Sequence, residues 1–357
     1  MEYQGMQLHN ITQLVYDEIY NDYQLCRVPE WLRRRLNTKA QKNIRFVSGC
    51  ELRFIMEDEQ VSIGLRRMPV SGGILPQGMA QIYQGDFQGS YPIGPQAVSV
   101  EGSRVVIRRQ DLSHIQRFSQ AETASPGRGF SPEVTRVLLP YDWGCFLGDV
   151  KGAVRPPEPG MVPEKRLLFY GSSISHGGNA SMTAKTWAFR LAESLGWDSI
   201  NLGCAGSAWM DEAMSQWIAE RNDWDAAVFE LGINVISLWT PSRLYEEALS
   251  FIRRVKAAHP EKPVFVADMF YSHHDFSHNP AAASFRQAIE SCVRKLALEW
   301  PELYYINGLE VMGEEDGFCC LSSDGLHPSD LGHEVIGRRM KEKIEPCLPG
   351  KNKRSRP

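Results

Sequence analysis

A serine, a histidine and an aspartate in the second half of this 357-residue chain have the types and spacing that acyl transfer requires. Two residues separate Asp324 from His327, which lets the carboxylate reach Nδ1 of the imidazole within one loop. Nε2 is then free to take the proton of a hydroxyl, and Ser173 carries such a hydroxyl on a Gly-Ser-Ser turn. Because serine is a poor nucleophile at its free pKa, it needs a base of this kind. The three residues therefore predict a catalytic triad.

Two more segments offer donors for the negative charge that develops on a carbonyl oxygen. Gly206 ends the sequence Asn-Leu-Gly-Cys-Ala-Gly, where a glycine lets the backbone N–H approach a substrate closely. Asn234 ends the sequence Glu-Leu-Gly-Ile-Asn and offers a neutral side-chain amide. Together with the backbone N–H of Ser173, these groups predict an oxyanion hole.

Each segment also has an ordinary structural explanation when it is taken alone. Ser173 could be an ordinary serine of a turn, Gly206 an ordinary glycine of a loop, and Asn234 the cap of a helix. Asp324 fits a helix N-cap, and His327 fits a surface histidine. The chemical interpretation rests on all four segments occurring in this order, a coincidence far rarer than any one of them.

The elements that must position these residues follow an alternating pattern after residue 165. Trp187, Leu191 and Leu195 recur every four residues, which places them on one face of a helix. Alternating strands and helices predict an α/β domain, a three-layer parallel sheet with helices on both faces, over residues 165–347. Functional residues of such folds gather beyond the carboxyl ends of the strands. The expected strands are 166–170, 199–202, 226–231, 264–269 and 303–306, and the expected helices are 186–195, 211–220, 243–258, 281–298 and 329–344.

In the first 150 residues, apolar and polar side chains mostly alternate, with a period of two. Leu52, Phe54 and Met56 alternate with Glu51, Arg53 and Glu57, and similar short runs recur up to residue 139. Short strands between Gly, Pro, Ser and Asp turns predict an all-β sandwich, jelly-roll-like, over residues 1–150. The segment 28–36 is expected to be a short helix or loop packed onto this sandwich.

Two segments of unusual composition flank the α/β domain. Residues 151–164 contain four prolines, which cannot join a helix or a central strand, so a stiff linker or a domain seam is predicted there. Residues 348–357 are rich in lysine and arginine and are predicted to be a flexible basic tail.

Bulk properties exclude several classes of protein. With a net charge of −4 and intermixed acids and bases, neither nucleic acid nor a membrane is expected as a partner. No signal-peptide pattern is evident, and no apolar stretch approaches the roughly 18 residues of a membrane span. The eight cysteines are scattered and form no CxxC pair, which favours a reducing cytoplasm. No cofactor is expected, and a homo-oligomer remains open.

Taken together, the four segments resemble the motif blocks of the SGNH hydrolases, also called the GDSL esterase/lipase superfamily, over residues 166–343. The first block usually reads Gly-Asp-Ser, whereas here Ser172 replaces the aspartate. Gly-Ser-Ser-Ile variants resemble a branch of carbohydrate deacetylases and acyltransferases, and a β-sandwich ahead of the hydrolase domain also resembles that branch. The roles implied by motif position are nucleophile for Ser173, base and orienting acid for His327 and Asp324, and oxyanion donors for Ser173, Gly206 and Asn234.

This resemblance implies a serine esterase that forms an acyl-enzyme on small esters, with acetylated carbohydrates as the leading substrate class. Two alternatives stay open. An acyltransferase would use the same triad and pass the acyl group to an alcohol. A carbohydrate-binding protein would have a hydrolase domain that has lost its activity.

Three further side chains are candidates for contact with substrate. Trp209 lies three residues after Gly206 and could shape an acyl or sugar subsite, although a core position is at least as good an explanation. His273 and His274 follow the strand expected at 264–269 and could line the pocket or lie in a solvated loop. A metal site in this loop is disfavoured, because no HExxH motif or cysteine ligand accompanies the histidines.

Overall fold

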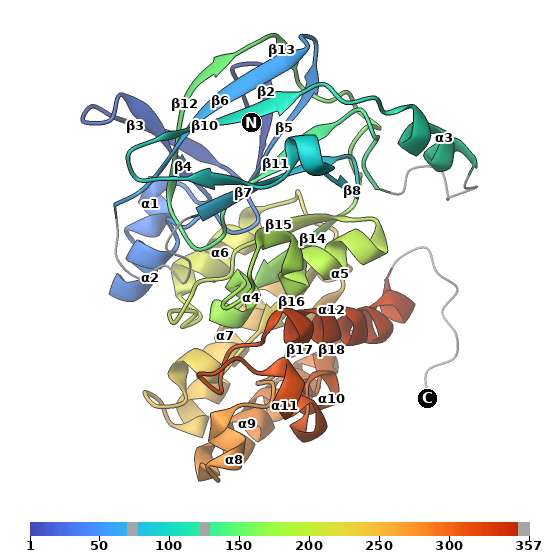
Figure 1. Ribbon diagram of the computed structural model, residues 1–357. Helices are drawn as coiled ribbons and strands as arrows, with labels where there is room; N and C mark the ends of the chain where they lie inside the picture. The colour runs from blue at the N-terminus through green and yellow to red at the C-terminus, as the bar shows by residue number, and fades with distance from the viewer. Residues whose placement is uncertain (70–77, 122–128, 349–357) are drawn as a thin grey trace.

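The computed structural model describes residues 1–69, 78–121 and 129–348 of the chain. Figure 1 shows antiparallel strands, blue to green, in one part of the molecule and helices around a second sheet, green to red, in the other. Two architectures therefore follow one another along the sequence, as predicted. Residues 349–357, which make up most of the predicted basic tail, lie outside the described residues.

The C-terminal part contains a parallel sheet of five short strands, β14 (Arg166–Tyr170), β15 (Asp198–Asn201), β16 (Ala226–Glu230), β17 (Val264–Ala267) and β18 (Leu303–Ile306). Their order across the sheet is β15-β14-β16-β17-β18. Every residue of β16 and β17 is buried, because helices cover both faces of the sheet. In a sheet of this order, a ligand crevice opens where the order reverses, between the carboxyl ends of β14 and β16.

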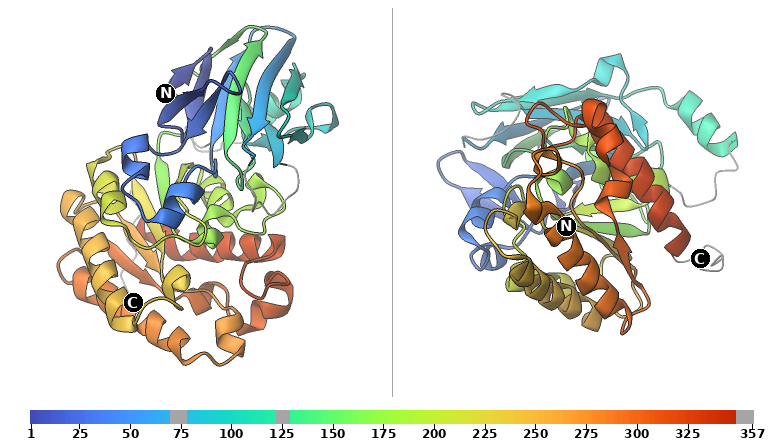
Figure 2. Two further views of the ribbon diagram at one scale, coloured as in Figure 1. Left: turned by 90° about the vertical axis from the view of Figure 1, so that its left-hand side faces the viewer. Right: turned by 90° about the horizontal axis from the view of Figure 1, so that it is seen from below.

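Two groups of helices cover this sheet, as Figure 2 shows from two sides. One face carries α5 (Trp187–Leu195) and α12 (Asp330–Ile344), and the other carries α6 (Glu212–Glu220), α7 (Pro241–Ala258) and α9 (Pro280–Ala297). Capping fixes their ends: Thr186 accepts a hydrogen bond at the start of α5, and Gly196 closes it in a left-handed conformation. The predicted α/β layers are confirmed, and the ends of the predicted elements differ by at most two residues.

Shorter helices occupy the loops of the C-terminal part. They are α4 (Ser173–His176), α8 (His273–Phe276), α10 (Gly308–Val311), α11 (Gly317–Cys320), and the 3₁₀ turns η2 (Thr183–Lys185), η3 (Ile233–Val235), η4 (Glu314–Asp316) and η5 (Glu345–Cys347). Of these, α4, η3, α8 and α10 directly follow strands of the sheet, so they lie at its carboxyl edge. Within the described residues, no helix is long and apolar enough to cross a membrane.

The N-terminal part is a sandwich of two antiparallel sheets, which confirms the predicted all-β architecture. One sheet contains β1 (Glu2–Tyr3), β2 (Met6–His9), β5 (Glu51–Met56), β7 (Gly78–Gln84), β8 (Phe87–Gln88), β9 (Gln96–Val98), β11 (Thr135–Leu138) and β13 (Val154–Arg155). The other contains β3 (Gln13–Asp17), β4 (Asp22–Cys26), β6 (Gln60–Arg67), β10 (Ser103–Arg108) and β12 (Cys145–Lys151). Alternate residues of β6, namely Val61, Ile63 and Leu65, enter the core between the sheets. The loops add α3 (Ser113–Ala121) and η1 (Tyr91–Ile93).

Two segments behave differently from the sequence-based expectation. Within the stretch predicted as a linker, Val154 and Arg155 form β13 and pair with β5, because they precede the first proline of that stretch. The segment predicted to pack onto the sandwich forms α1 (Glu30–Arg33), followed by α2 (Thr38–Asn43). The expected short helix is therefore present, but its buried apolar residues pack into the core of the α/β part, so the expected packing onto the sandwich is wrong.

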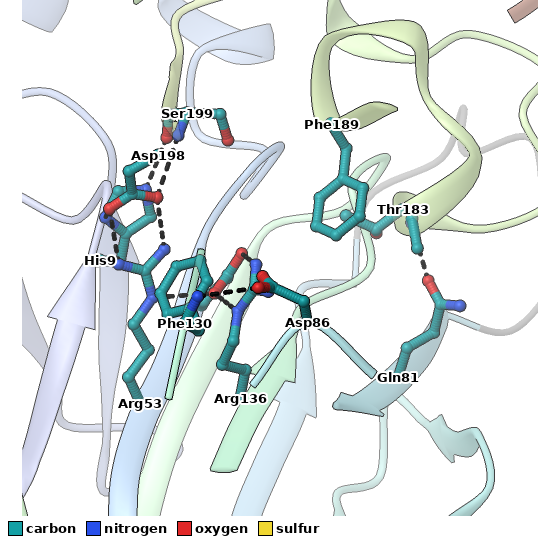
Figure 3. Close-up of polar contacts among 12 residues, drawn as sticks. His9, Arg53, Gln81, Asp86, Phe130, Arg136, Thr183, Phe189, Asp198 and Ser199 are labelled. Atoms are coloured by element: carbon teal, nitrogen blue, oxygen red, sulfur yellow. Dashed lines mark hydrogen bonds and ion pairs between the residues drawn. The ribbon is translucent and has the colours of Figure 1, made fainter. Parts of the chain in front are cut away.

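Buried ions join the two parts, as Figure 3 shows. Arg53 of β5 donates two hydrogen bonds of 2.7 Å to the carboxylate of Asp198, which begins β15. Glu51 accepts hydrogen bonds from Arg53 at 2.8 Å and from Arg136 at 2.7 and 2.9 Å. Phe130 packs against both guanidinium groups, with distances of 4.6 and 3.8 Å from their central carbons to the ring centroid. The sandwich is therefore bonded to the edge strand of the parallel sheet.

Candidate active site

Ser173 stands at the carboxyl end of β14, on the first turn of α4. The Oγ of Ser172 accepts a hydrogen bond of 3.0 Å from the N–H of Ile174 and so caps this short helix. Gly171 must be a glycine, because a Cβ there would lie 2.8 Å from Oε2 of Glu230. The local sequence therefore makes a sharp turn from strand to helix, with Ser173 at the ligand edge of the sheet.

The structure brings Ser173, His327 and Asp324 together in one chain of hydrogen bonds. Nε2 of His327 lies 2.7 Å from Oγ of Ser173, and Nδ1 lies 2.7 Å from Oδ2 of Asp324. Because Nδ1 donates to the carboxylate, Nε2 is left as the acceptor for the serine proton. This arrangement can deprotonate Ser173 as its hydroxyl attacks a carbonyl carbon.

The carboxylate of Asp324 is held by more than the imidazole. Its Oδ1 accepts hydrogen bonds from the N–H groups of Leu326 at 2.9 Å and His327 at 3.0 Å. Its Oδ2 also accepts a hydrogen bond of 2.9 Å from the side-chain amide of Asn179. Partial burial raises the pKa of Asp324, but the hydrogen bonds from the N–H groups of His327 and Leu326 and from the imidazole outweigh it and bring the pKa to about 2. Asp324 is therefore ionised at neutral pH and can stabilise a charged imidazolium.

The three expected oxyanion donors come from three adjacent strands of the sheet. Ser173 follows β14, Gly206 lies in the loop after β15, and Asn234 follows β16. Gly206 adopts a left-handed backbone conformation with φ of 62°, which glycine tolerates without strain. Oδ1 of Asn234 accepts a hydrogen bond of 3.1 Å from the N–H of Ala208, so its Nδ2 is the end left to donate to a ligand.

A buried carboxyl group lies directly beneath the nucleophile turn. Oε2 of Glu230 accepts hydrogen bonds from the N–H of Ser172 at 2.8 Å, the hydroxyl of Ser172 at 2.7 Å, and the hydroxyl of Ser175 at 3.0 Å. Oε1 has no hydrogen-bond partner among the described residues. Burial raises the pKa of Glu230 to about 7 against the lowering effect of these bonds. Glu230 thus holds the turn where Ser172 replaces the usual aspartate.

The loop after β15, residues 202–211, is held from both sides. Asn201 donates to the carbonyl of Ser175 at 2.8 Å and accepts from the N–H of Gly203 at 2.8 Å, which joins this loop to α4. From the N-terminal part, Asn37 donates to the carbonyl of Ser207 at 3.0 Å, and Asn43 donates to the carbonyl of Ala205 at 2.6 Å. The segment that carries α1 and α2 therefore positions the loop that contains Gly206.

The three expected substrate contacts lie at different places. Trp209 packs partly against the α/β core, and its buried Nε1 has no hydrogen-bond partner among the described residues. The N–H of His273 donates to the carbonyl of Gly325 at 2.6 Å, so this residue contacts the loop that carries Asp324. The ring of His274 instead packs on that of His273, with centroids 4.0 Å apart. No hydrogen bond or ion pair joins these two rings to the triad in the described ranges.

Asn179 and Glu230 touch the site and were missed by the sequence reading. Glu230 left a signal, because an acidic residue at the end of a fully buried apolar strand requires an explanation. Asn179 left none, since its contact with Asp324 spans 145 residues. Among residues 1–69, 78–121 and 129–348, no group of three or more metal-ligating side chains gathers.

Comparisons with known proteins agree with this geometry. A model of the GDSL-like lipase/acylhydrolase family matches residues 164–345. No curated protein sequence matches the chain. Among solved structures, a salicylyl-acyltransferase from a tetracycline biosynthetic pathway has a TM-score of 0.78 at 15% identity, covering 96% of this chain and 94% of that one.

Two carbohydrate esterases have a similar fold over most of the chain. A family two carbohydrate esterase from Clostridium thermocellum, in complex with cellohexaose, has a TM-score of 0.60 at 13% identity, covering 95% of this chain and 98% of its own. A family two carbohydrate esterase from Cellvibrio japonicus has a TM-score of 0.62 at 10% identity, covering 97% and 96%. At identities this low, the structural likeness establishes a shared two-part fold alone.

Proposed function

The chain belongs to the GDSL-like lipase/acylhydrolase family, and from this premise we propose that it is a serine esterase acting on small acyl esters. In this proposal Ser173 is the nucleophile, His327 is the general base, and Asp324 orients and stabilises the imidazole. The observation that carries the proposal is the unbroken chain of 2.7 Å contacts from Ser173 through His327 to Asp324. Such a chain activates a hydroxyl that is otherwise a poor nucleophile.

Catalysis proceeds by two acyl transfers. Oγ of Ser173 attacks the ester carbonyl while its proton moves to Nε2 of His327, and the carbonyl oxygen becomes an oxyanion. The N–H groups of Ser173 and Gly206 and the amide of Asn234 donate to that oxyanion. When the intermediate collapses, the alcohol leaves with the proton from His327 and the acyl group stays on Ser173. Water, deprotonated by His327, then releases the acid.

Acetylated carbohydrates are the substrate class that we propose. The support is the likeness in fold to carbohydrate esterases, one of them in complex with cellohexaose. A closed acyl site would favour acetate over longer chains, because a small pocket excludes additional methylene groups.

A second candidate is acyl transfer to an alcohol, supported by the likeness to the salicylyl-acyltransferase. The same acyl-enzyme would form, and an acceptor hydroxyl would replace water in the second step. The two functions differ only in what reaches the acyl-enzyme.

One assay tests both candidates. Release of 4-nitrophenol from 4-nitrophenyl acetate is measured for the wild type, for Ser173→Ala, and for Ser277→Ala as a control at an exposed serine. We expect Ser173→Ala to lose activity and Ser277→Ala to keep it. Added glycerol or glucose that accelerates release and becomes acetylated would favour the transferase. No turnover by the wild type, or equal rates in wild type and Ser173→Ala, would refute the esterase.

A further inference from the structure

A concentration of positive charge lies beside the proposed site, in a chain whose net charge is −4. It is the segment of residues 33–45, called here the basic segment, which begins at the end of α1 and includes α2. Its six cations are Arg33, Arg34, Arg35, Lys39, Lys42 and Arg45. The neighbouring Glu30 pairs with Arg33 at 2.6 Å and with Arg34 at 2.9 Å. The other four cations form no ion pair with any described residue.

The basic segment is fixed in place by polar bonds on one side and by the core on another. Asn37 and Asn43 bond to carbonyls of the loop that carries Gly206, and Ala40 and Ile44 are buried in the α/β core. Lys39 and Lys42 are exposed. Residues 39 and 42 stand one turn apart in α2, so their ammonium groups extend from neighbouring positions on the same helix.

Lys39 reaches the glycine proposed for the oxyanion hole. Its Nζ lies 2.8 Å, and its Cε 3.0 Å, from the point that a Cβ on Gly206 would occupy. The ammonium group of Lys39 therefore lies beside the backbone of Gly206. This charge is partly screened by solvent, and Lys39 forms no ion pair with any residue in the described ranges.

A groove of about 270 Å³ is also lined by residues of the basic segment. Lys42 and Arg45 provide charge there, and Phe46 and Met68 provide an apolar wall. A volume of this size accommodates a ring that bears one anionic group. The basic segment thus offers cations at two places, Lys39 beside Gly206 and Lys42 with Arg45 in the groove.

We propose that the physiological substrate is an ester of an anionic alcohol, whose carboxylate or phosphate group is held by Lys39 and then by Lys42 and Arg45. This inference rests on the proposed esterase function. It assigns the charge to the alcohol part, because the acyl group of the proposed reaction is small. The basic segment would also raise the rate of encounter with such a substrate at low salt, through electrostatic steering.

The test compares three acetyl esters: methyl 4-acetoxybenzoate, which is neutral, 4-acetoxybenzoate, and 4-acetoxyphenyl phosphate. Values of kcat/KM are measured for the wild type, for Lys39→Glu, and for Lys151→Glu as a control at an exposed lysine of β12. Each ester is compared with itself across variants, so differences in leaving-group reactivity cancel. We expect Lys39→Glu to lower the anionic-to-neutral ratio of kcat/KM by about tenfold or more, and Lys151→Glu to leave that ratio unchanged.

The two anionic esters distinguish the sources of charge, because the one more affected by Lys39→Glu identifies carboxylate or phosphate as the preferred group. Added NaCl should reduce the wild-type ratio and have little effect in Lys39→Glu. An equal loss on neutral and anionic esters, or an equal effect of Lys151→Glu, would overturn the inference while leaving the esterase intact. A wild type that hydrolyses none of the three would overturn the proposed function as well.

Discussion

Two clusters of charged side chains in this protein differ chiefly in their access to water. At the junction of the two parts, the side chains of Glu51, Arg53 and Asp198 are each at most 3% exposed. At the proposed active site, the side chains of His327 and Asp324 are 21% and 43% exposed. Both clusters are well hydrogen-bonded. The first is sealed between two sheets, and the second stands at the open edge of one.

This difference in access separates a structural role from a chemical one. Ions sealed from water and fully paired hold a fixed geometry, and breaking one pair leaves an uncompensated buried charge. A catalytic base must exchange protons with substrate and solvent, so it needs an exposed face. Substitutions in the two clusters should therefore affect different observables.

The largest expected effect is on catalysis alone. His327→Ala removes the proposed general base, and kcat should fall by about 10⁴-fold or more. The melting temperature should remain close to that of the wild type, because the ring is partly exposed and its partners stay solvated. Stopped-flow or steady-state assays on 4-nitrophenyl acetate, with calorimetry on the same sample, measure both quantities. A loss of less than tenfold would remove His327 from the mechanism.

The next effect is on stability alone. Arg53→Met leaves Glu51 and Asp198 without their shared partner. The free energy of unfolding should therefore decrease by about 3–5 kcal/mol. The activity per folded molecule should be unchanged. Arg109→Met is the matched control, since its pair with Glu59 is exposed and should contribute less than about 1 kcal/mol. Urea titration measures both, and equal losses for the two variants would show that burial does not matter here.

A smaller effect on rate should follow from loss of one oxyanion donor. Asn234→Ala removes the side-chain amide, and kcat should fall by about 10²–10³-fold with little change in KM. Its Oδ1 also accepts from Ala208, so the loop after β15 loses one contact. Asn234→Asp is an informative companion, because a carboxylate at that position would repel the oxyanion. A change confined to KM would place Asn234 in substrate binding instead.

The smallest expected effect is on both stability and rate, and it concerns Glu230. This residue is buried like the ions at the junction, yet it contacts the turn that carries the nucleophile. The pKa of Glu230 is raised to about 7, so the protonated carboxyl group contributes to the stability of the fold. This contribution is fully present at a pH below the usual pKa of a glutamate, and it is lost as the pH rises through about 7. Glu230→Gln cannot ionise, so its stability relative to the wild type should increase with pH across that range. Its kcat should fall by about tenfold or less, as a charge-assisted acceptor becomes neutral. If the stabilities of the two proteins changed with pH in the same way, that result would contradict the raised pKa of Glu230.

The parts of the molecule that follow local rules could be predicted from the sequence. The strand 166–170 is short, apolar and bounded by a Gly-Ser-Ser turn, and β14 has these bounds. The geometry of Asp324 and His327 is encoded within four residues of one loop. Membership of the family could also be predicted, because the four motif blocks occur in order. The two-part fold could be predicted because a pattern of period two gives way to alternating strands and helices.

Long-range contacts could not be predicted, since no local pattern records them. The junction joins Arg53 to Asp198 across 145 residues, and Lys39 approaches Gly206 from the other part of the chain. The expected packing of the segment 28–36, which contains α1, is wrong for the same reason. Alternating apolar residues show that a face is buried, but not which neighbour buries it.

The central claim is that Ser173 is a nucleophile activated by His327. Incubation of the full chain with a fluorophosphonate probe, followed by digestion and mass spectrometry, tests it most directly. A single adduct on Ser173 is expected, absent in Ser173→Ala and formed far more slowly in His327→Ala. An unmodified wild type, or an adduct on another serine such as Ser175, would contradict the account.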